Sequence, residues 1–160
     1  MTAPIVSDDD FDDFINVRAL KMAVKLQLLM QRRALRPARL QLQEWRILLS
    51  LARHGDQHLR AITERAALDP AHASRTAARL LKRGLILRSQ DRADKRRHVL
   101  SLTPAGIAMV EEIWPTAQGI TQEFRALFSD REFQDFKSLL DRSIGLADQL
   151  LAQTEPNVQG

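Results

Sequence analysis

Residues 69–106 read DPAHASRTAARLLKRGLILRSQDRADKRRHVLSLTPAG, and they contain the strongest local indications of structure in the chain. Asp69 and Pro70 combine a carboxylate cap with a proline at the first helical position, which predicts a helix that ends at Gly84. The residues that follow are typical of two short strands around the polar tip SQDRADKRR, and then of another helix entrance. The stretch therefore predicts a helix at residues 70–83 and a hairpin of two strands at residues 85–88 and 98–102. A second helix is predicted to start at residue 104.

Positive charge is concentrated in the same stretch. Between His72 and Arg97 the chain has nine Lys or Arg and only two Asp, a balance of +7. The whole chain carries +4, so the remaining residues sum to −3. A weakly basic protein with its charge distributed in this way is expected to touch a polyanion at that place.

The composition excludes several classes of protein. The 160 residues fit one domain or two closely joined halves, and 44% hydrophobic with only 5% aromatic residues favours helices. The absence of cysteine excludes a disulfide framework, a cysteine nucleophile, a thiolate zinc site and a thiol switch. The sequence has no long apolar run, and its start is acidic where a signal peptide is basic, so we expect a cytoplasmic protein. We expect disordered tails at residues 1–8 and 154–160.

Apolar stripes with helical spacing run along both ends of the chain. Residues 10–33 contain no proline or glycine and carry two such stripes, and Ser129 with Glu132 forms a capping box before the last helix. A terminal helix that is apolar on two sides needs cover on both, usually from its own domain and another subunit. We therefore expect the terminal helices to form a dimerisation layer, with candidate contacts at Phe14, Phe133, Phe136, Leu140 and Ile144.

The basic middle of the chain has the features of a DNA-reading module. A helix of this length fits the major groove, where short polar side chains beside arginines can read base edges. An arginine-rich hairpin can reach the neighbouring minor groove. A basic helix face is often merely solvated, and for Arg79 or Lys82 taken alone that alternative stays open. The candidate DNA contacts are His72, Ser74, Arg75, Thr76 and Arg79 on the helix, and Arg92, Asp94, Arg96 and Arg97 on the hairpin.

Three segments together resemble the MarR family of bacterial winged-helix transcription regulators. They are LQEWRILL, DPAHASRTAARLLKRGLILR and DKRRHVLSLTPAG. The resemblance implies a mainly α fold with a small β-wing, in which a winged helix-turn-helix domain at residues 40–103 is flanked by N- and C-terminal dimerisation helices at residues 10–36 and 104–152.

The resemblance also implies how the protein meets DNA. A homodimer would place its two recognition helices in successive major grooves of a pseudo-palindromic operator, as a repressor. In the matching wing positions, Arg96 would enter the minor groove and Asp94 would orient it. Since the chain lacks cysteine, it does not fit the peroxide-sensing branch of the family.

Family members commonly release DNA when a small aromatic or phenolic acid binds between the dimer layer and the DNA-binding lobe. Arg18 lies on an otherwise apolar helix face and is the first candidate to hold such a carboxylate. An intersubunit salt bridge, or a side chain that reaches out to solvent, is the alternative for Arg18. Arg46, beside Trp45, is the second candidate, although Trp45 itself is better suited to the core.

Other functions find less support in the sequence. His54 and His58 are four residues apart, but Gly55 interrupts the helical geometry that two metal ligands would use, so we expect no metal or other cofactor. No catalytic triad, phosphate loop or paired-carboxylate motif indicates an enzyme. A winged helix that binds another protein, without ligand response, remains the alternative. A steep loss of DNA affinity with salt would argue against that alternative.

Overall fold

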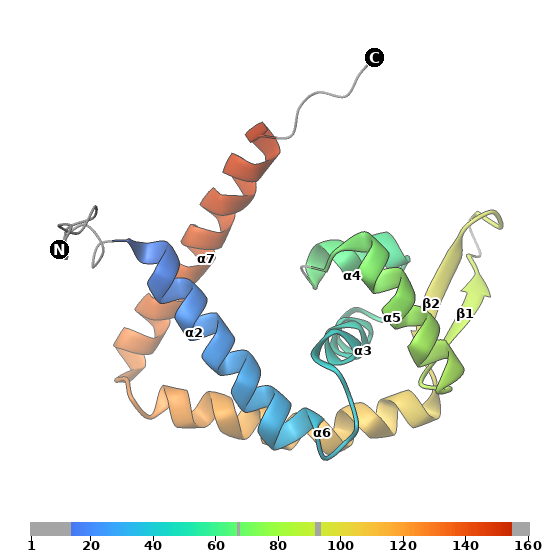
Figure 1. The fold of residues 1–160 in the computed structure, drawn as a ribbon, viewed down its shortest axis with the longest axis horizontal. Coiled ribbons are helices and arrows are strands. Elements are labelled where there is room, and N and C mark those ends of the chain that lie inside the picture. The colour runs from blue at the N-terminus through green and yellow to red at the C-terminus, as the bar shows by residue number, and fades with distance from the viewer. Residues whose placement is uncertain (1–13, 67, 92–93, 155–160) are drawn as a thin grey trace, which may run out of the picture. The chain divides into compact units, whose positions relative to one another are not determined.

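The computed structural model describes residues 14–66, 68–91 and 94–154 (Figure 1). It confirms the predicted fold class, because the elements are helices apart from one two-stranded hairpin. The chain divides into two compact units, with the boundary between Gln118 and Gly119 in the sequence. The elements, in chain order, are α2 (Ile15–Met30), the π-helix η1 (Gln31–Leu35), α3 (Leu42–His54), α4 (Leu59–Arg65), α5 (Pro70–Lys82), β1 (Ile86–Gln90), β2 (His98–Leu102), α6 (Pro104–Arg125) and α7 (Asp130–Thr154).

The first unit is built around a core shared by α3, α4 and α5. α3 packs on both of the other helices, and α4 packs on α5 (Figure 1). Burying such side chains contributes roughly 1.5 to 3 kcal/mol each, which makes this cluster the main source of stability in the unit. The fully buried apolar side chains at its centre are Leu35, Ile47, Leu48, Ile62 and Leu80.

The first helix ends differently from the sequence prediction. α2 continues past Met30 as a five-residue π-helix, and the chain then turns at residues 36–39. The Leu40 N–H donates to the Leu35 carbonyl at 2.9 Å, which closes the helix end. The predicted start at residue 10 lies outside the described residues, as do residues 1–8 and 155–160 of the predicted tails, whereas Thr154 lies in α7.

A hairpin forms the wing. β1 and β2 pair antiparallel, with Ile86 opposite Leu102 at the base and Gln90 opposite His98 toward the tip. Gln57, just before α4, adds a short bridge to Leu100 on β2. The wing is therefore attached at its base to the helical core.

Thr103 connects the wing to α6. Its hydroxyl donates to the Gly84 carbonyl at 2.6 Å and accepts from the Gly106 N–H at 3.0 Å, so it caps α6 against the end of α5. Gly84 has a φ of +68°, a left-handed conformation that favours glycine. A Cβ on Gly106 would collide with the Leu85 carbonyl oxygen, so this close approach requires glycine.

The second unit contains the end of α6 and α7. The predicted capping box is confirmed: Glu132 accepts from the Ser129 N–H at 2.8 Å and from its hydroxyl at 2.7 Å. The Ser129 hydroxyl and N–H hold the pKa of Glu132 below its ordinary value, since both donate to the carboxylate. Phe128 packs against Phe133 and Phe136, with ring centroids 6.3 and 5.5 Å apart.

Gly106→Ala should destabilise the protein, although alanine has the higher helix propensity. Overpacking against the Leu85 backbone is expected to cost about 1 to 3 kcal/mol of unfolding free energy, measured by urea denaturation. Gly119→Ala in the same helix is the matched control. It has open space around its Cβ and should leave stability unchanged or raise it by up to about 1 kcal/mol. Equal stability of the two variants would contradict the close-approach argument.

Candidate nucleic-acid interface

The N-terminus of α5 is fixed by the residues that the sequence indicated. The Asp69 carboxylate accepts from the His72 N–H at 2.8 Å, and Pro70 occupies the first helical position. The cap prediction is thereby confirmed. α5 buries Ala73, Ala77 and Leu80, and it packs on both α3 and α4.

The outward face of α5 is narrower than predicted. Ser74 and Arg75 are exposed and His72 is half-buried, but Thr76 is fully buried. Placing Thr76 among the outward residues was therefore wrong. Thr76 lies three residues after Ala73 and four before Leu80, so helical geometry puts it on the buried face, and this spacing could have shown it from the sequence.

A buried carboxylate holds the second half of α5. Glu44 on α3 has a side chain only 4% exposed, and it pairs with Arg79 at 3.3 Å and with Arg83 at 3.1 Å. The same carboxylate accepts from the Gln41 N–H at 2.9 Å and so caps α3. Arg79 also donates to the Gln41 side chain at 2.9 Å and to the Thr76 hydroxyl at 3.1 Å.

This network changes the assignment of Arg79. Its guanidinium is engaged with α3, so its first effect is to orient α5 rather than to read bases. Sequence reasoning missed Glu44, because the two arginines lie 35 and 39 residues away from it. The signal that the sequence offered was a single glutamate among the apolar residues of the helix LQEWRILL.

The wing tip is organised by Asp94. Its carboxylate accepts from the Arg96 main-chain N–H at 3.0 Å, and the Arg97 N–H donates to its carbonyl at 2.9 Å. The resemblance implied that Asp94 orients the Arg96 side chain, whereas in the structure the Asp94 carboxylate holds the Arg96 main chain. Asp94, Arg96 and Arg97 are exposed, and Arg92 lies outside the described residues.

His58 ties α4 to the wing, a role that the sequence did not suggest. Its Nε2 lies 2.8 Å from the Asp91 carboxylate, and its Nδ1 lies 2.9 Å from the His98 carbonyl oxygen. Both partners are acceptors, so only a ring with a proton on each nitrogen donates to both. Among the described residues no cluster of His, Asp or Glu suits a metal ion, and His58 is instead a link within the fold.

Replacing His58 with alanine should loosen the wing tip. The Asp91 and Arg97 amides lie in the turn that this link supports, and their hydrogen exchange should accelerate roughly five- to tenfold on loss of one or two hydrogen bonds. The Leu100 amide, which donates to Gln57, should keep its protection. His54→Ala, an exposed position at the end of α3, is the control measured by the same NMR experiment. Unchanged exchange in the His58 variant would refute the link.

One pocket of the first unit has the character of a ligand site. It has a volume of about 500 Å³ and lies between α3 and α6, where one guanidinium, that of Arg53, accompanies mostly apolar side chains. Trp114 contributes an aromatic surface and is 43% exposed. The lining residues are Leu49, Ala52, Arg53, Val110 and Trp114.

The residues predicted to bind a ligand lie elsewhere. Trp45 is 4% exposed and belongs to the hydrophobic core, as its alternative role predicted, and it does not line this pocket. Arg46 is half-buried on α3, and Arg18 is exposed on α2, and neither lines this pocket. Arg53 was missed because nothing in the sequence showed which residues of α6 it would face.

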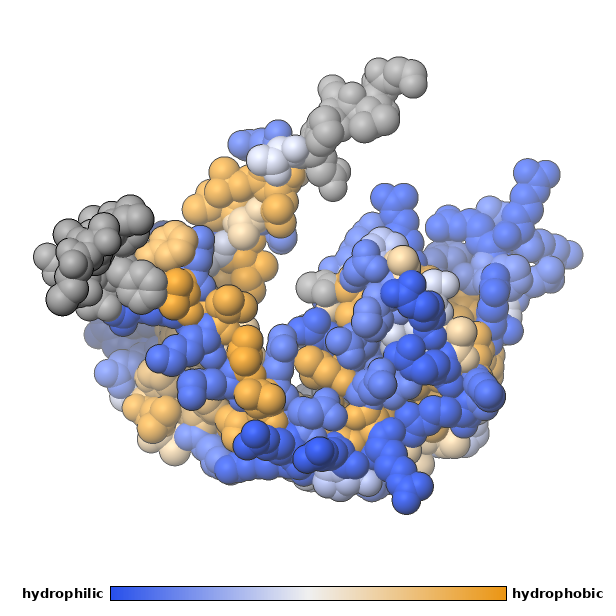
Figure 2. Space-filling model, in the orientation of Figure 1, coloured by the Kyte–Doolittle hydropathy of each residue, from blue (hydrophilic) through white to orange (hydrophobic). Residues whose placement is uncertain are grey.

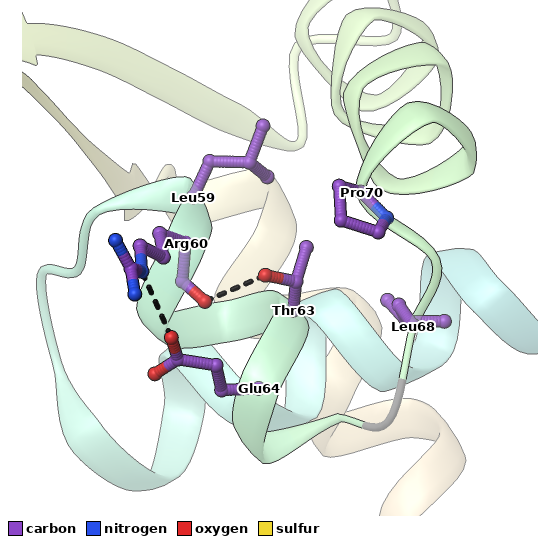
Figure 3. Close-up of a pocket in the computed structure, with 6 residues that line it drawn as sticks. All are labelled: Leu59, Arg60, Thr63, Glu64, Leu68 and Pro70. Carbon is purple, nitrogen blue, oxygen red and sulfur yellow. Dashed lines mark hydrogen bonds and ion pairs between the residues drawn. The ribbon is translucent and has the colours of Figure 1, made fainter. Parts of the chain in front are cut away.

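A second pocket of about 500 Å³ lies beside α4 (Figure 3). Its polar side chains already have partners: Arg60 pairs with Glu64 at 3.0 Å, and the Thr63 hydroxyl donates to the main-chain carbonyl of Arg60 at 2.6 Å. The rest of its surface is apolar, from Leu59, Leu68 and Pro70. The two charged side chains of this pocket neutralise each other, whereas the guanidinium of Arg53 has no carboxylate beside it among the residues that line its pocket.

Apolar side chains remain exposed on α2 and α7. Figure 2 shows orange surface over both helices, in contrast to the mainly blue surface over α5 and the wing. Neither helix buries a side chain. Of the candidate dimerisation residues, Phe14, Leu140 and Ile144 are exposed, while Phe133 and Phe136 are half-buried against Phe128. In the described part of the chain, no helix is long and apolar enough to cross a membrane.

Comparison with known proteins places this geometry in context. The model of the MarR family matches residues 40–98. A probable transcriptional regulator from Pseudomonas aeruginosa has a similar structure, with 30% identity, a TM-score of 0.73, and coverage of 82% of this chain and 98% of the other. Bordetella bronchiseptica BpsR is 28% identical, with a TM-score of 0.68 and coverage of 79% and 96%. The Bacillus subtilis transcriptional repressor MdtR is 28% identical over 74% of each chain.

Proposed function

Because the chain belongs to the MarR family of transcriptional regulators, we propose that it is a homodimeric repressor that binds a pseudo-palindromic operator and leaves it when a small aromatic acid binds. The observation that carries the proposal is the exposed Ser74–Arg75 face of α5. Asp69 caps the start of this helix, and Glu44 on α3 pairs with Arg79 in its second half. A rigid helix with an exposed arginine meets the requirement for reading base edges. MdtR is a relative described as a transcriptional repressor, which supports repression rather than activation.

The DNA contacts divide between helix and wing. Arg75, with Ser74 beside it, enters the major groove, and His72 at the start of the helix contacts the backbone. Arg96 and Arg97 lie at the wing tip and approach the minor groove, whose negative potential attracts guanidinium groups. Arg79 acts indirectly, since it holds α5 against α3.

The dimer rests on the exposed apolar faces of α2 and α7. Large apolar side chains that stay exposed along a helix mark a surface that another chain covers. Contacts made by the same helix faces on two copies give a two-fold axis, and two-fold symmetry requires an operator whose half-sites repeat with inverted orientation. The side chains offered for this contact are Phe14, Leu20, Val24, Leu140, Ile144 and Leu151.

Arg75→Ala and Arg96→Ala should affect operator binding in different ways. An operator selected from random DNA serves as the probe, with fluorescence anisotropy as the measurement. Loss of a bidentate base contact at Arg75 should cost about 1 to 3 kcal/mol and relax the base preference at one position of each half-site. Arg96→Ala should weaken binding with little change in that preference.

The control variant is Arg131→Ala, which removes an exposed arginine of α7 and should bind as the parent does. If Arg75→Ala and Arg96→Ala also bound with parental affinity, the assigned contacts would be wrong. The parent should lose affinity steeply with salt, because its phosphate contacts release counterions. A flat response on operator and random DNA alike would favour the alternative of a protein-interaction module.

The effector site is the pocket that contains Arg53. BpsR is a relative whose DNA binding is described as regulated by 6-hydroxynicotinic acid, an aromatic acid. The apolar lining and Trp114 suit an aromatic ring, and the Arg53 guanidinium suits a carboxylate. Arg53 replaces Arg18 and Arg46 as the residue proposed to hold it.

A thermal-shift series tests this site. Aromatic carboxylates, with 6-hydroxynicotinic acid among them, should include a compound that stabilises the parent by about 2.7 kcal/mol at a hundred times its dissociation constant. Arg53→Gln should abolish that stabilisation, whereas Arg46→Gln, on the same helix but outside the pocket, should retain it. The uncharged amide of the same compound should give a smaller shift. A ligand effect that survives Arg53→Gln would place the effector elsewhere.

A further inference from the structure

A second basic segment lies outside the recognition helix and wing. Residues 31–43 contain no acidic residue, and the segment between α2 and α3 carries four arginines within eight positions. All four are exposed, and Figure 2 shows hydrophilic surface where α2 ends. We call residues 32–39 the arginine turn; its arginines are Arg32, Arg33, Arg36 and Arg39.

Arg39 adopts a backbone conformation that does not favour arginine. Its φ is +52°, in the left-handed region, at a helix end where glycine is the usual residue. The main chain holds this position in the fold: the Arg39 N–H donates to the Arg36 carbonyl at 3.1 Å, and the next residue, Leu40, is buried. An exposed arginine kept where glycine is less strained indicates that its side chain has a use outside the fold.

The arginine turn lies along one flank of α5. Arg83 near the end of α5 donates to the Arg39 carbonyl at 3.2 Å, and Arg79 donates to Gln41 at 2.9 Å. The wing lies along the opposite flank, where Ser74 and Leu81 share a pocket of about 330 Å³ with side chains of β1 and β2. The outward face of α5, with Arg75 and Lys82, is therefore bordered by basic residues on both sides.

We propose that the arginine turn binds phosphates of the operator strand that runs on the side of α5 opposite to the wing. A helix in the major groove has one phosphate backbone on each side, and the wing serves only one of them. The turn supplies the matching positive charge on the other side, through Arg32, Arg36 and Arg39. The inference rests on the proposed DNA-binding function and extends its interface.

The double variant Arg36→Ala/Arg39→Gly tests the proposal without disturbing the fold. Glycine relieves the left-handed conformation at residue 39, so the melting temperature should stay the same or rise. Affinity for operator and for random DNA should both fall, on the order of tenfold at fixed salt, since phosphate contacts carry no sequence information. The slope of log affinity against log salt should decrease by about 0.9 per lost contact, hence roughly 3 to 4 for a dimer.

Two matched variants separate contact from net charge. Arg131→Ala/Arg142→Ala removes the same charge from exposed positions of α7 and should keep the parental slope. Arg36→Lys/Arg39→Lys keeps the charge at the turn and should retain most of the slope. Ethylation interference on the parent complex should mark phosphates beside the recognition helix on the side away from the wing, and the double variant should lose those marks.

Different results would contradict the phosphate contacts of the arginine turn and the proposed DNA-binding function. If the parent binds its operator and the double variant has the same affinity and slope, the arginine turn does not touch DNA and the inference fails alone. The same holds if the α7 control loses as much affinity as the double variant. If the parent binds no DNA, the proposed function fails as well.

Discussion

The buried Glu44 carboxylate is the interaction on which the DNA-binding surface depends. It caps α3 through the Gln41 N–H and accepts from Arg79 and Arg83, so a single side chain fixes the start of one helix and the end of another. A carboxylate removed from water is costly unless it is paired, and here two guanidinium groups and a backbone amide satisfy it. The orientation of α5, and with it the direction in which Ser74 and Arg75 point, follows from this contact.

Local signals predicted the elements well. Asp69 and Pro70 gave the start of α5, Ser129 and Glu132 gave the start of α7, and the polar tip between two β-prone runs gave the wing. Each is decided by residues within one or two turns of the chain, which is the range that sequence periodicity and capping describe. The extension of α2 into a π-helix was not predictable, because it depends on how Leu35 and Leu40 enter the core.

The candidate site was predicted only where its residues are neighbours in sequence. Arg75, Arg96 and Arg97 were identified and are exposed, whereas Thr76 proved to be buried and Arg79 to be engaged with α3. The His58 link, the Glu44 network and the Arg53 pocket all join residues far apart in the chain. The arginine turn lies outside the basic segment at residues 72–97, and it comes to lie beside α5 only in the folded chain.

The division of α5 into two faces has a consequence for how such proteins diversify. Ala73, Thr76, Ala77 and Leu80 are the buried side chains of this helix, whereas Ser74 and Arg75 are exposed. Substitution on the outer face should therefore change the free energy of unfolding little. Residues outside this face, such as Glu44, keep the helix in place while the residues that contact bases change. A duplicated gene could thus acquire a new operator by altering two or three codons, and its thermodynamic stability would not restrict which bases it came to prefer.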